Sequence, residues 1–259
     1  MKNQEKLFTR VLDGLFNSPV VTLFQHLSGY TSMADGYELD GIRVVRDGVV
    51  TVCIVEIGSG ELALVDAGYD RAGTAILREL ERRGADSSAV KAILLTHGHI
   101  DHIGAVPLFP DAQVMVLTDD VDLTEGRARS RGALSMILPP NQLPIKVSRP
   151  LTDGDMFKLG NRTVRVYAIP GHTPGSAAFL IDDILIVGDT AFSAQNGKMV
   201  EASCPFTDDV EQSRQSLKRL AARLESEGLP VKAIFFSHAK PLEKGLAPLL
   251  EFAEGVEGK

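Results

Sequence analysis

Five apolar, strand-like runs of this chain each stop at a histidine or an aspartate. In chain order, the runs A-L-V, A-I-L-L-T, V-R-V-Y-A-I-P-G, I-L-I-V-G and A-I-F-F-S lead into Asp66, His97, His172, Asp189 and His238. Open sheets gather ligand-binding groups in the crevice beyond their strand ends, so these side chains are expected to converge on one cleft. A fold that meets this constraint must carry five distant segments to the same edge of its sheets.

The run before His97 continues into the densest cluster of such residues, T-H-G-H-I-D-H, which holds three of the six histidines. His97 and His99 are two positions apart and point to the same side if the segment is extended. Asp101 and His102 are adjacent and can serve a neighbouring position. Gly98 permits a tight turn that a side chain would resist. The cluster therefore offers ligands for two metal ions rather than for one.

From residue 41 onward, strand-like segments alternate with helical ones. Three turn signals predict β-hairpins, at Gly58–Gly60, Gly160-Asn161 and Asp182-Asp183. Helices are predicted at 70–84, with Asp70 near the N-cap and Gly84 just past the end, then from near Thr207, and around 246–252. Hairpins interspersed with helices imply sheets that are covered by helices on their outer faces.

Residues 1–40 differ from the rest and are predicted to form an N-terminal arm beside a main domain at 41–259. Apolar residues recur there at the spacing of an amphipathic helix, namely Leu7, Phe8, Val11, Leu12, Leu15 and Phe16. This apolar stripe must be buried against another surface. Packing on the main domain is the favoured interpretation, a homodimer through the arm is the second, and a membrane surface is the least favoured.

Composition excludes several function classes. The formal net charge of −7 argues against a general nucleic-acid binder, which usually carries a basic excess. No apolar stretch approaches the roughly 20 residues of a membrane span, and the N-terminus lacks the pattern of a signal peptide. The two cysteines, Cys53 and Cys204, match no metal-ligand spacing. We therefore expect a soluble, cytoplasmic protein.

Four motifs in order resemble those of the metallo-β-lactamase superfamily. They are L-V-D-A-G at 64–68, T-H-G-H-I-D-H at 96–102, G-H-T-P-G-S at 171–176 and G-D-T at 188–190. The resemblance covers about residues 42–240. It implies an α+β fold, a four-layer αβ/βα sandwich of two mixed β-sheets flanked by helices. It also implies a dinuclear metal site at one edge of the two sheets.

The resemblance assigns roles to seven candidate metal ligands and to Asp66. The first metal ion would be held by His97, His99 and His172, the second by Asp101, His102 and His238, and Asp189 would bridge both. Asp101 and Asp189 would also act in catalysis, and Asp66 would orient a ligand from outside the site. Imidazole and carboxylate ligands suit Zn²⁺, with iron or manganese as alternatives.

Such a site predicts hydrolysis. Neither group of ligands is closed by protein atoms alone, which leaves room for a shared water. Coordination can lower the pKa of water from about 16 to about 7 and so supply a metal-bound hydroxide at neutral pH. We expect this hydroxide to attack the carbonyl of a small ester, thioester or lactone. The alternatives are an iron-dependent, oxygen-using enzyme similar to sulfur dioxygenases, a phosphodiesterase or nuclease, and a metal-binding module without enzymatic activity.

Departures from known branches of the superfamily narrow this expectation. True β-lactamases lack the bridging aspartate, whereas Asp189 is present here. Hydroxyacylglutathione hydrolases (glyoxalase II) carry a helical C-terminal domain that binds glutathione, and only 21 residues follow His238. The sequence therefore most resembles a single-domain enzyme of the glyoxalase II and lactonase-like branch.

Basic residues near the motifs suggest an anionic small-molecule substrate. Arg127, Arg129 and Arg131 alternate in G-R-A-R-S-R-G, between the first two ligand motifs, and Lys240 follows His238 by two positions. A loop that overhangs the site would let these cations bind a carboxylate or phosphate group. The alternative, an ordinary solvated surface, stays open for all four residues.

Overall fold

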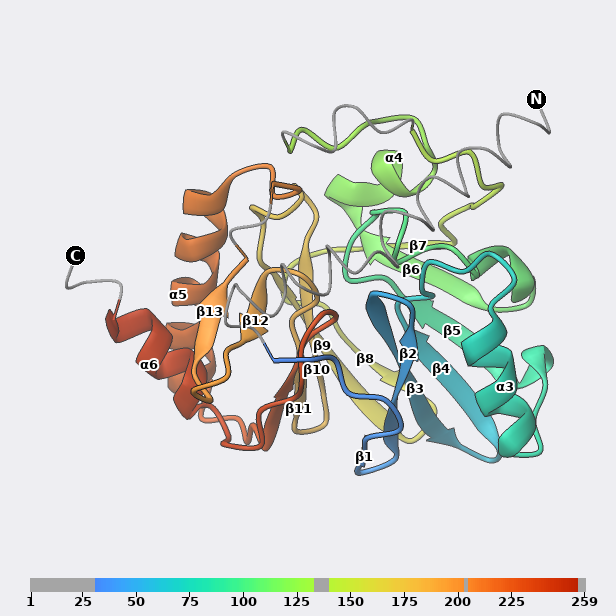
Figure 1. Cartoon of the computed structure of the whole chain (residues 1–259), viewed down its shortest axis with the longest axis horizontal. Helices are drawn as coiled ribbons and strands as arrows, with labels where there is room; N and C mark the ends of the chain where they lie inside the picture. The colour runs from blue at the N-terminus through green and yellow to red at the C-terminus, as the bar shows by residue number, and fades with distance from the viewer. Residues whose placement is uncertain (1–30, 133–139, 203–204, 256–259) are drawn as a thin grey trace.

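Two β-sheets face each other at the centre of the molecule, and helices cover their outer faces, as Figure 1 shows for this computed structural model. The structure describes residues 31–132, 140–202 and 205–255. The predicted N-terminal helix, with its dimer alternative, lies outside the described residues. None of the helices within these ranges is long and apolar enough to cross a membrane.

The first sheet has seven strands, which neighbour one another in sequence order. They are β1 (Glu38–Leu39), β2 (Ile42–Asp47), β3 (Val50–Gly58), β4 (Glu61–Val65), β5 (Val90–Leu94), β6 (Gln113–Leu117) and β7 (Arg149–Leu151). The strands from β1 to β4 pair antiparallel, and those from β4 to β7 pair in parallel. The predicted hairpin at Gly58–Gly60 is confirmed. β1 lies within the predicted arm, so the end of that segment belongs to the sheet.

The second sheet has five strands in the order β14-β11-β10-β9-β8. They are β8 (Met156–Leu159), β9 (Arg162–Ala168), β10 (Ala177–Ile181), β11 (Ile184–Ile186) and β14 (Ala233–Phe235), and a separate ribbon joins β12 (Ala191–Ser193) to β13 (Met199–Glu201). The predicted hairpins at Gly160-Asn161 and Asp182-Asp183 connect β8 to β9 and β10 to β11. β14 pairs in parallel with β11, so both sheets are mixed.

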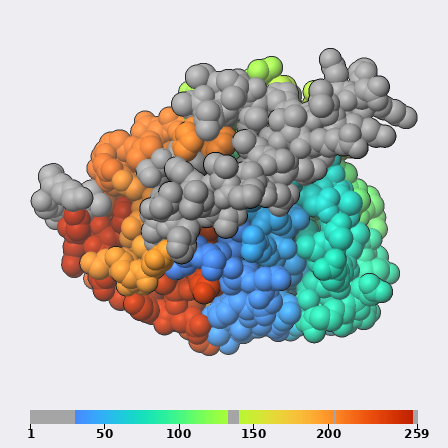
Figure 2. Space-filling view, in the orientation of Figure 1, coloured from blue at the N-terminus to red at the C-terminus, as the bar shows by residue number. Residues whose placement is uncertain are grey.

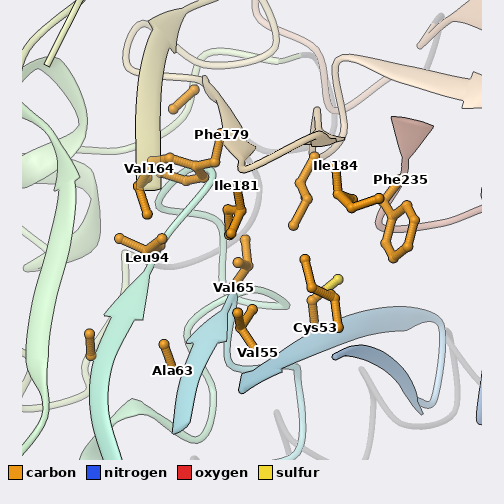
Figure 3. Packing of buried hydrophobic residues seen from close by; sticks show 14 of the residues in the cluster. Cys53, Val55, Ala63, Val65, Leu94, Val164, Phe179, Ile181, Ile184 and Phe235 are labelled. Carbon is orange, nitrogen blue, oxygen red and sulfur yellow. The ribbon is translucent and has the colours of Figure 1, made fainter. Parts of the chain in front are cut away.

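Strands buried on both faces explain the continuous apolar runs of the sequence. Successive side chains of a strand point to opposite faces, so Phe179 and Ile181 of β10 enter the core between the sheets while Leu180 faces outward to the helices. Figure 3 shows Phe179 and Ile181 opposite Val65 and Leu94 of the first sheet. Packing in this inter-sheet core holds the two sheets together and so fixes the position of the strand ends of one sheet relative to those of the other.

Helices complete the outer layers. α3 (Thr74–Arg82) packs Ile76 and Leu80 on the first sheet, and α5 (Val210–Glu227) and α6 (Ala247–Gly255) cover the second. The shorter helical segments are η1 (Ser87–Ala89), η2 (Val106–Leu108), η3 (Thr118–Asp120) and α4 (Val121–Thr124). On the surface, the blue-to-teal and the orange-to-red halves lie on opposite sides (Figure 2). The predicted four-layer αβ/βα sandwich of an α+β protein is confirmed.

Two helix starts differ from the sequence prediction. The N-cap of α3 is Gly73, not Asp70, whose carboxylate instead accepts a hydrogen bond from the Thr74 N–H at 3.0 Å. α5 begins at Val210, three residues after Thr207, because the Asp209 side chain caps it by accepting from the Gln212 N–H. Thr207 is thereby free of the helix, and its hydroxyl contacts a histidine described below.

A buried carboxylate on α3 gives a prediction about stability. Glu79 is 7% exposed, and it pairs with Arg82 at 2.7 Å, Arg83 at 2.8 Å and Arg43 at 2.9 Å. Hydrogen bonds from Arg82 lead the causes that lower the Glu79 pKa from 4.5 to about 2. The folded protein therefore binds fewer protons here than the unfolded chain, and this stabilisation is complete above the unfolded pKa and lost as the pH falls toward the folded pKa.

We expect Glu79→Gln to lower the free energy of unfolding by about 2 kcal/mol near neutral pH. The gap between wild type and variant should narrow below about pH 4.5, because protonated Glu79 resembles the neutral glutamine. Urea unfolding of both proteins at about pH 7 and about pH 3 measures this gap. An equal gap at the two pH values would contradict the ion-pair explanation.

Candidate metal centre

The five strand-end residues lie in loops at the carboxyl ends of their strands. Asp66 follows β4, His97 follows β5, His172 follows β9, Asp189 follows β11 and His238 follows β14, each within four residues of the strand. β4 and β5 are parallel neighbours in one sheet, and β11 and β14 are parallel neighbours in the other. Because parallel strands end at the same edge, each sheet presents its ligand-bearing loops together, as the sequence predicted.

Seven side chains converge there in two groups. The first group is His97, His99 and His172, and the second is Asp101, His102, Asp189 and His238. Within each group, one potential ligand atom from every member lies within 4.8 Å of the others. The structure thus brings together all seven residues that the sequence proposed as ligands, in the two predicted sets, with Asp189 placed in the second.

The first group, called here the three-histidine group, presents three ring nitrogens to one point. His172 Nε2 lies 3.0 Å from His99 Nδ1 and 3.2 Å from His97 Nε2. Burial lowers the pKa of His97 and of His172, and neighbouring histidines disfavour a further positive charge. These imidazoles are therefore held neutral, which is the form that binds metal ions.

Asp189 lies between the two groups. Its Oδ2 atom is 2.9 Å from His238 Nε2, 3.3 Å from His102 Nε2 and 3.6 Å from His172 Nε2. The last of these histidines belongs to the three-histidine group and the other two to the second group. One carboxylate oxygen therefore faces both groups, as a bridging ligand requires. Asp101 Oδ2 completes the second group at 3.5 Å from His238 Nε2.

Charges within the second group are arranged for a cation. Burial disfavours the charged form of His102, but the carboxylates of Asp189, Asp66 and Asp101 outweigh burial and raise its pKa. For His238, burial is likewise outweighed by Asp189, and the pKa is raised. The carboxylates therefore favour the protonated form of the two imidazoles that face the candidate metal site. A divalent cation would replace those protons, so its binding would release them.

The non-ligand nitrogens of four histidines already have partners, which fixes the direction of each ring. His102 Nδ1 lies 2.8 Å from Asp66 Oδ2, and His172 Nδ1 lies 3.1 Å from the Thr207 hydroxyl. His97 Nδ1 lies 3.1 Å from the Thr96 hydroxyl, and His238 Nδ1 contacts the Val49 carbonyl. Such partners orient the rings of metal-binding histidines.

A buried atom without a partner tests whether the residues fit a metal. Asp189 Oδ1 is buried and has no hydrogen-bond partner among the described residues. Buried polar atoms are normally paired, so this carboxylate oxygen lacks a partner that a cation would supply. Together with the imidazole and carboxylate donors, this unpaired atom fits divalent metal ions in both groups.

Asp66 occupies the orienting position that the sequence predicted. It is 1% exposed, and besides His102 it accepts from the Thr96 N–H at 2.8 Å and from the Thr96 hydroxyl. Sequence reasoning missed Thr96 and Thr207 because a threonine carries no distinctive signal. It also missed the buried Asp120, which follows β6 just as the other site residues follow their strands, so the strand-end signal could have identified it.

The proposed substrate-binding cations do not contact the ligands. Arg127 pairs with Asp122 and Glu125, whereas Arg129, Arg131 and Lys240 are exposed. Within the described ranges, no hydrogen bond or ion pair joins these four side chains to the seven ligands. The loop does connect to the site, because Asp208 Oδ1 accepts from the N–H of Arg131 at 2.7 Å and the Asp208 N–H donates to the His172 carbonyl. A role in substrate binding stays a prediction.

Comparison with known proteins identifies the family. The sequence model of the metallo-β-lactamase superfamily matches residues 45–238, most of the chain. The chain belongs to the metallo-β-lactamase superfamily. This superfamily member is 29% identical over 239 residues to the probable metallo-hydrolase YflN of Bacillus subtilis (strain 168), a match that covers 78% of the chain and 85% of YflN.

Hydroxyacylglutathione hydrolases are also relatives of this superfamily member. The Methylococcus capsulatus enzyme is 31% identical over 232 residues, covering 85% of the chain and 77% of the relative. The Aliivibrio salmonicida enzyme is 34% identical over 131 residues, which is 51% of the chain and 42% of the relative. The second match thus spans less than half of the relative's length.

Solved structures share the fold of this superfamily member. A metallo-β-lactamase family protein of Thermus thermophilus has a TM-score of 0.63 at 24% identity, covering 85% of this chain and 80% of that one. BJP-1, a subclass B3 metallo-β-lactamase of Bradyrhizobium japonicum, has a TM-score of 0.65 at 20% identity, covering 89% and 94%. The family match and the cluster of histidines and aspartates together indicate a protein of the metallo-hydrolase superfamily. The side chains of that cluster imply divalent metal ions.

Proposed function

We propose that this protein is a dinuclear metal-dependent hydrolase that cleaves a small ester, thioester or lactone, with Zn²⁺ as the metal. The observation that carries the proposal is the position of Asp189 Oδ2, which faces His238 and His102 on one side and His172 on the other. A carboxylate shared in this way supports two cations close together. Imidazole and carboxylate donors favour Zn²⁺ over harder cations.

Two divalent cations would supply a Lewis acid for the substrate carbonyl and would acidify a water molecule at neutral pH. The residues of the chain provide the frame for this chemistry. Asp189 and Asp101 present carboxylate oxygens that can accept hydrogen bonds from water and so orient it. Asp66 and Thr207 hold the rings of His102 and His172 in place. Fixed supports of this kind keep reacting groups in productive geometry.

The ester and thioester class is supported by the relatives. A relative named hydroxyacylglutathione hydrolase matches 85% of the length of this chain. The bridging position of Asp189 also separates the site from the β-lactamase pattern, in which that aspartate is absent. We therefore place the reaction at an ester-like carbonyl and expect the substrate to be a small, anionic molecule.

A hydrolysis panel tests this proposal. Protein purified without added metal is assayed for metal content and then offered thioesters, lactones, phosphodiesters and β-lactams, with and without a chelator. We expect about two equivalents of Zn²⁺ and chelator-sensitive hydrolysis of a thioester or lactone. Bound iron with oxygen-dependent turnover would overturn the proposal in favour of the redox alternative. Phosphodiester cleavage alone would overturn the substrate class.

A further inference from the structure

Asp120 is a buried carboxylate to which no motif of the sequence assigns a role. It ends η3, which follows β6, and it is 0% exposed. Its Oδ2 accepts from the Gly98 N–H and from the Thr173 hydroxyl, both at 2.8 Å. Its Oδ1 accepts from the Gly175 N–H at 2.8 Å. All three donors lie in the loops that carry the three-histidine group.

These hydrogen bonds join loops from different sheets. Gly98 lies between His97 and His99, after β5 of the first sheet, whereas Thr173 directly follows His172, after β9 of the second. The three ring nitrogens of the three-histidine group lie close together only because these two loops are neighbours. Asp120 is thus a hydrogen-bonded link between the segment that supplies two of its ligands and the segment that supplies the third.

Two glycines of these loops, Gly98 and Gly175, are explained by the close approach of the Asp120–Thr124 segment. A Cβ on Gly98 would lie 2.8 Å from the Thr124 hydroxyl and 2.9 Å from the Thr124 N–H. A Cβ on Gly175 would lie 2.5 Å from the backbone nitrogen of Asp120. All three distances are shorter than the contacts that real Cβ atoms make. Glycine at these two positions therefore lets both loops reach the carboxylate.

We propose that Asp120 is a positioning residue that sets the geometry of the three-histidine group by holding its two loops in a fixed relative position. This inference rests on the proposed two-cation site, in which Asp66 serves the other group through the ring of His102. The two aspartates differ in how they reach the ligands, because Asp66 contacts the ring of His102 directly in addition to Thr96, whereas Asp120 contacts only loop backbone and a hydroxyl. Each should therefore govern the affinity of a different metal equivalent.

Metal binding, measured without reference to turnover, tests this division. Metal-free protein is titrated with Zn²⁺ alone in competition with a chromophoric chelator, for wild type, Asp120→Asn, Asp66→Asn and the double variant. We expect each single variant to bind one equivalent about 10–100-fold more weakly, as loss of a supporting partner does. The double variant should bind both equivalents more weakly, because the two aspartates act on different sites.

Glu79→Gln is the matched control for the loss of a buried, hydrogen-bonded carboxylate far from the ligands. It should lower stability and leave both Zn²⁺ affinities unchanged. If Asp120→Asn does not fold, Thr173→Val removes only one of the three donors and should weaken one equivalent about 3–10-fold, a smaller loss than that of a whole supporting side chain.

The outcomes separate this inference from the proposed function. Wild-type protein that binds no Zn²⁺ would remove both. Wild-type protein with two sites, together with wild-type affinities in Asp120→Asn or in a folded Thr173→Val, would overturn the role of Asp120 and leave the dinuclear hydrolase standing. Weakening of the same equivalent by Asp66→Asn and Asp120→Asn, with the other untouched in the double variant, would also overturn it.

Discussion

Replacing Asp189 with alanine is expected to abolish hydrolysis and to reduce the metal content. The carboxylate is the shared member of the site, because Oδ2 lies within 3.6 Å of ring nitrogens from both groups. Its loss removes negative charge that would offset two cations and leaves the Nε2 atoms of His238 and His102 without their nearest carboxylate. We expect kcat/KM to fall by at least about 10³-fold, equivalent to about 4 kcal/mol of transition-state stabilisation.

The measurement pairs kcat/KM on the best substrate of the hydrolysis panel with metal analysis of the purified variant. Metal content should drop from about two equivalents to one or fewer, because weaker coordination of either cation lets it dissociate. Asp111→Ala is the control, since this aspartate is exposed and precedes β6, at the opposite end of the strand from the ligand-bearing loops. Full metal content with normal turnover in Asp189→Ala would contradict the bridging role and the dinuclear site.

The sequence was sufficient to predict the strands that lead into the site residues, and the ends of those strands. In β5, Ala92 and Leu94 face the inter-sheet core while Val90 and Ile93 face the helices. Burial on both faces removes polar alternation and leaves an apolar run that stops where the chain leaves the sheet. A histidine or aspartate at such a stop stands out, because buried strands otherwise exclude these residues. This contrast identified five of the residues at the candidate metal centre.

The contacts that support the ligands could not be predicted in the same way. Asp120 accepts hydrogen bonds from the backbone of Gly98 and Gly175, and backbone donors are the same at every non-proline position. Thr207 contacts His172 across 35 positions, only because α5 begins later than its sequence pattern suggested. Which donor meets which acceptor depends on how the loops fold over the sheet edge.

The loop that carries Arg127, Arg129 and Arg131 shows that ion-pair partners were equally hard to predict from the sequence. Arg127 pairs with Asp122 and Glu125, which lie five and two positions earlier, and neither spacing is that of neighbours on a helix. The sequence showed three alternating arginines but not the acidic partners that the turn after α4 brings to one of them. Arg127 is exposed like Arg129 and Arg131, so its ion pairs with Asp122 and Glu125, and not burial, distinguish it from the other two arginines.

Gly171→Ala is expected to cause the largest loss of stability among glycine changes at the ligand loops. Gly171 precedes His172 and has φ +139, and a Cβ there would lie 2.1 Å from the Ser213 nitrogen and 2.4 Å from its Cα. These atoms belong to the backbone of α5, so neither can swing aside as a side chain could. Strain and overpacking together should lower the free energy of unfolding by about 3 kcal/mol.

Gly84→Ala separates strain from collision. Gly84 also has a positive φ, +69, but a Cβ there meets nothing within 4 Å, so its replacement should cost only about 1 kcal/mol. Denaturant unfolding of both variants gives the difference, and Zn²⁺ titration shows whether the three-histidine group is disturbed. Gly171→Ala should weaken one Zn²⁺ equivalent about 10–100-fold, because the contact with α5 sets where His172 stands. Equal losses of stability in the two variants would mean that α5 yields to the methyl group and does not position the ligand.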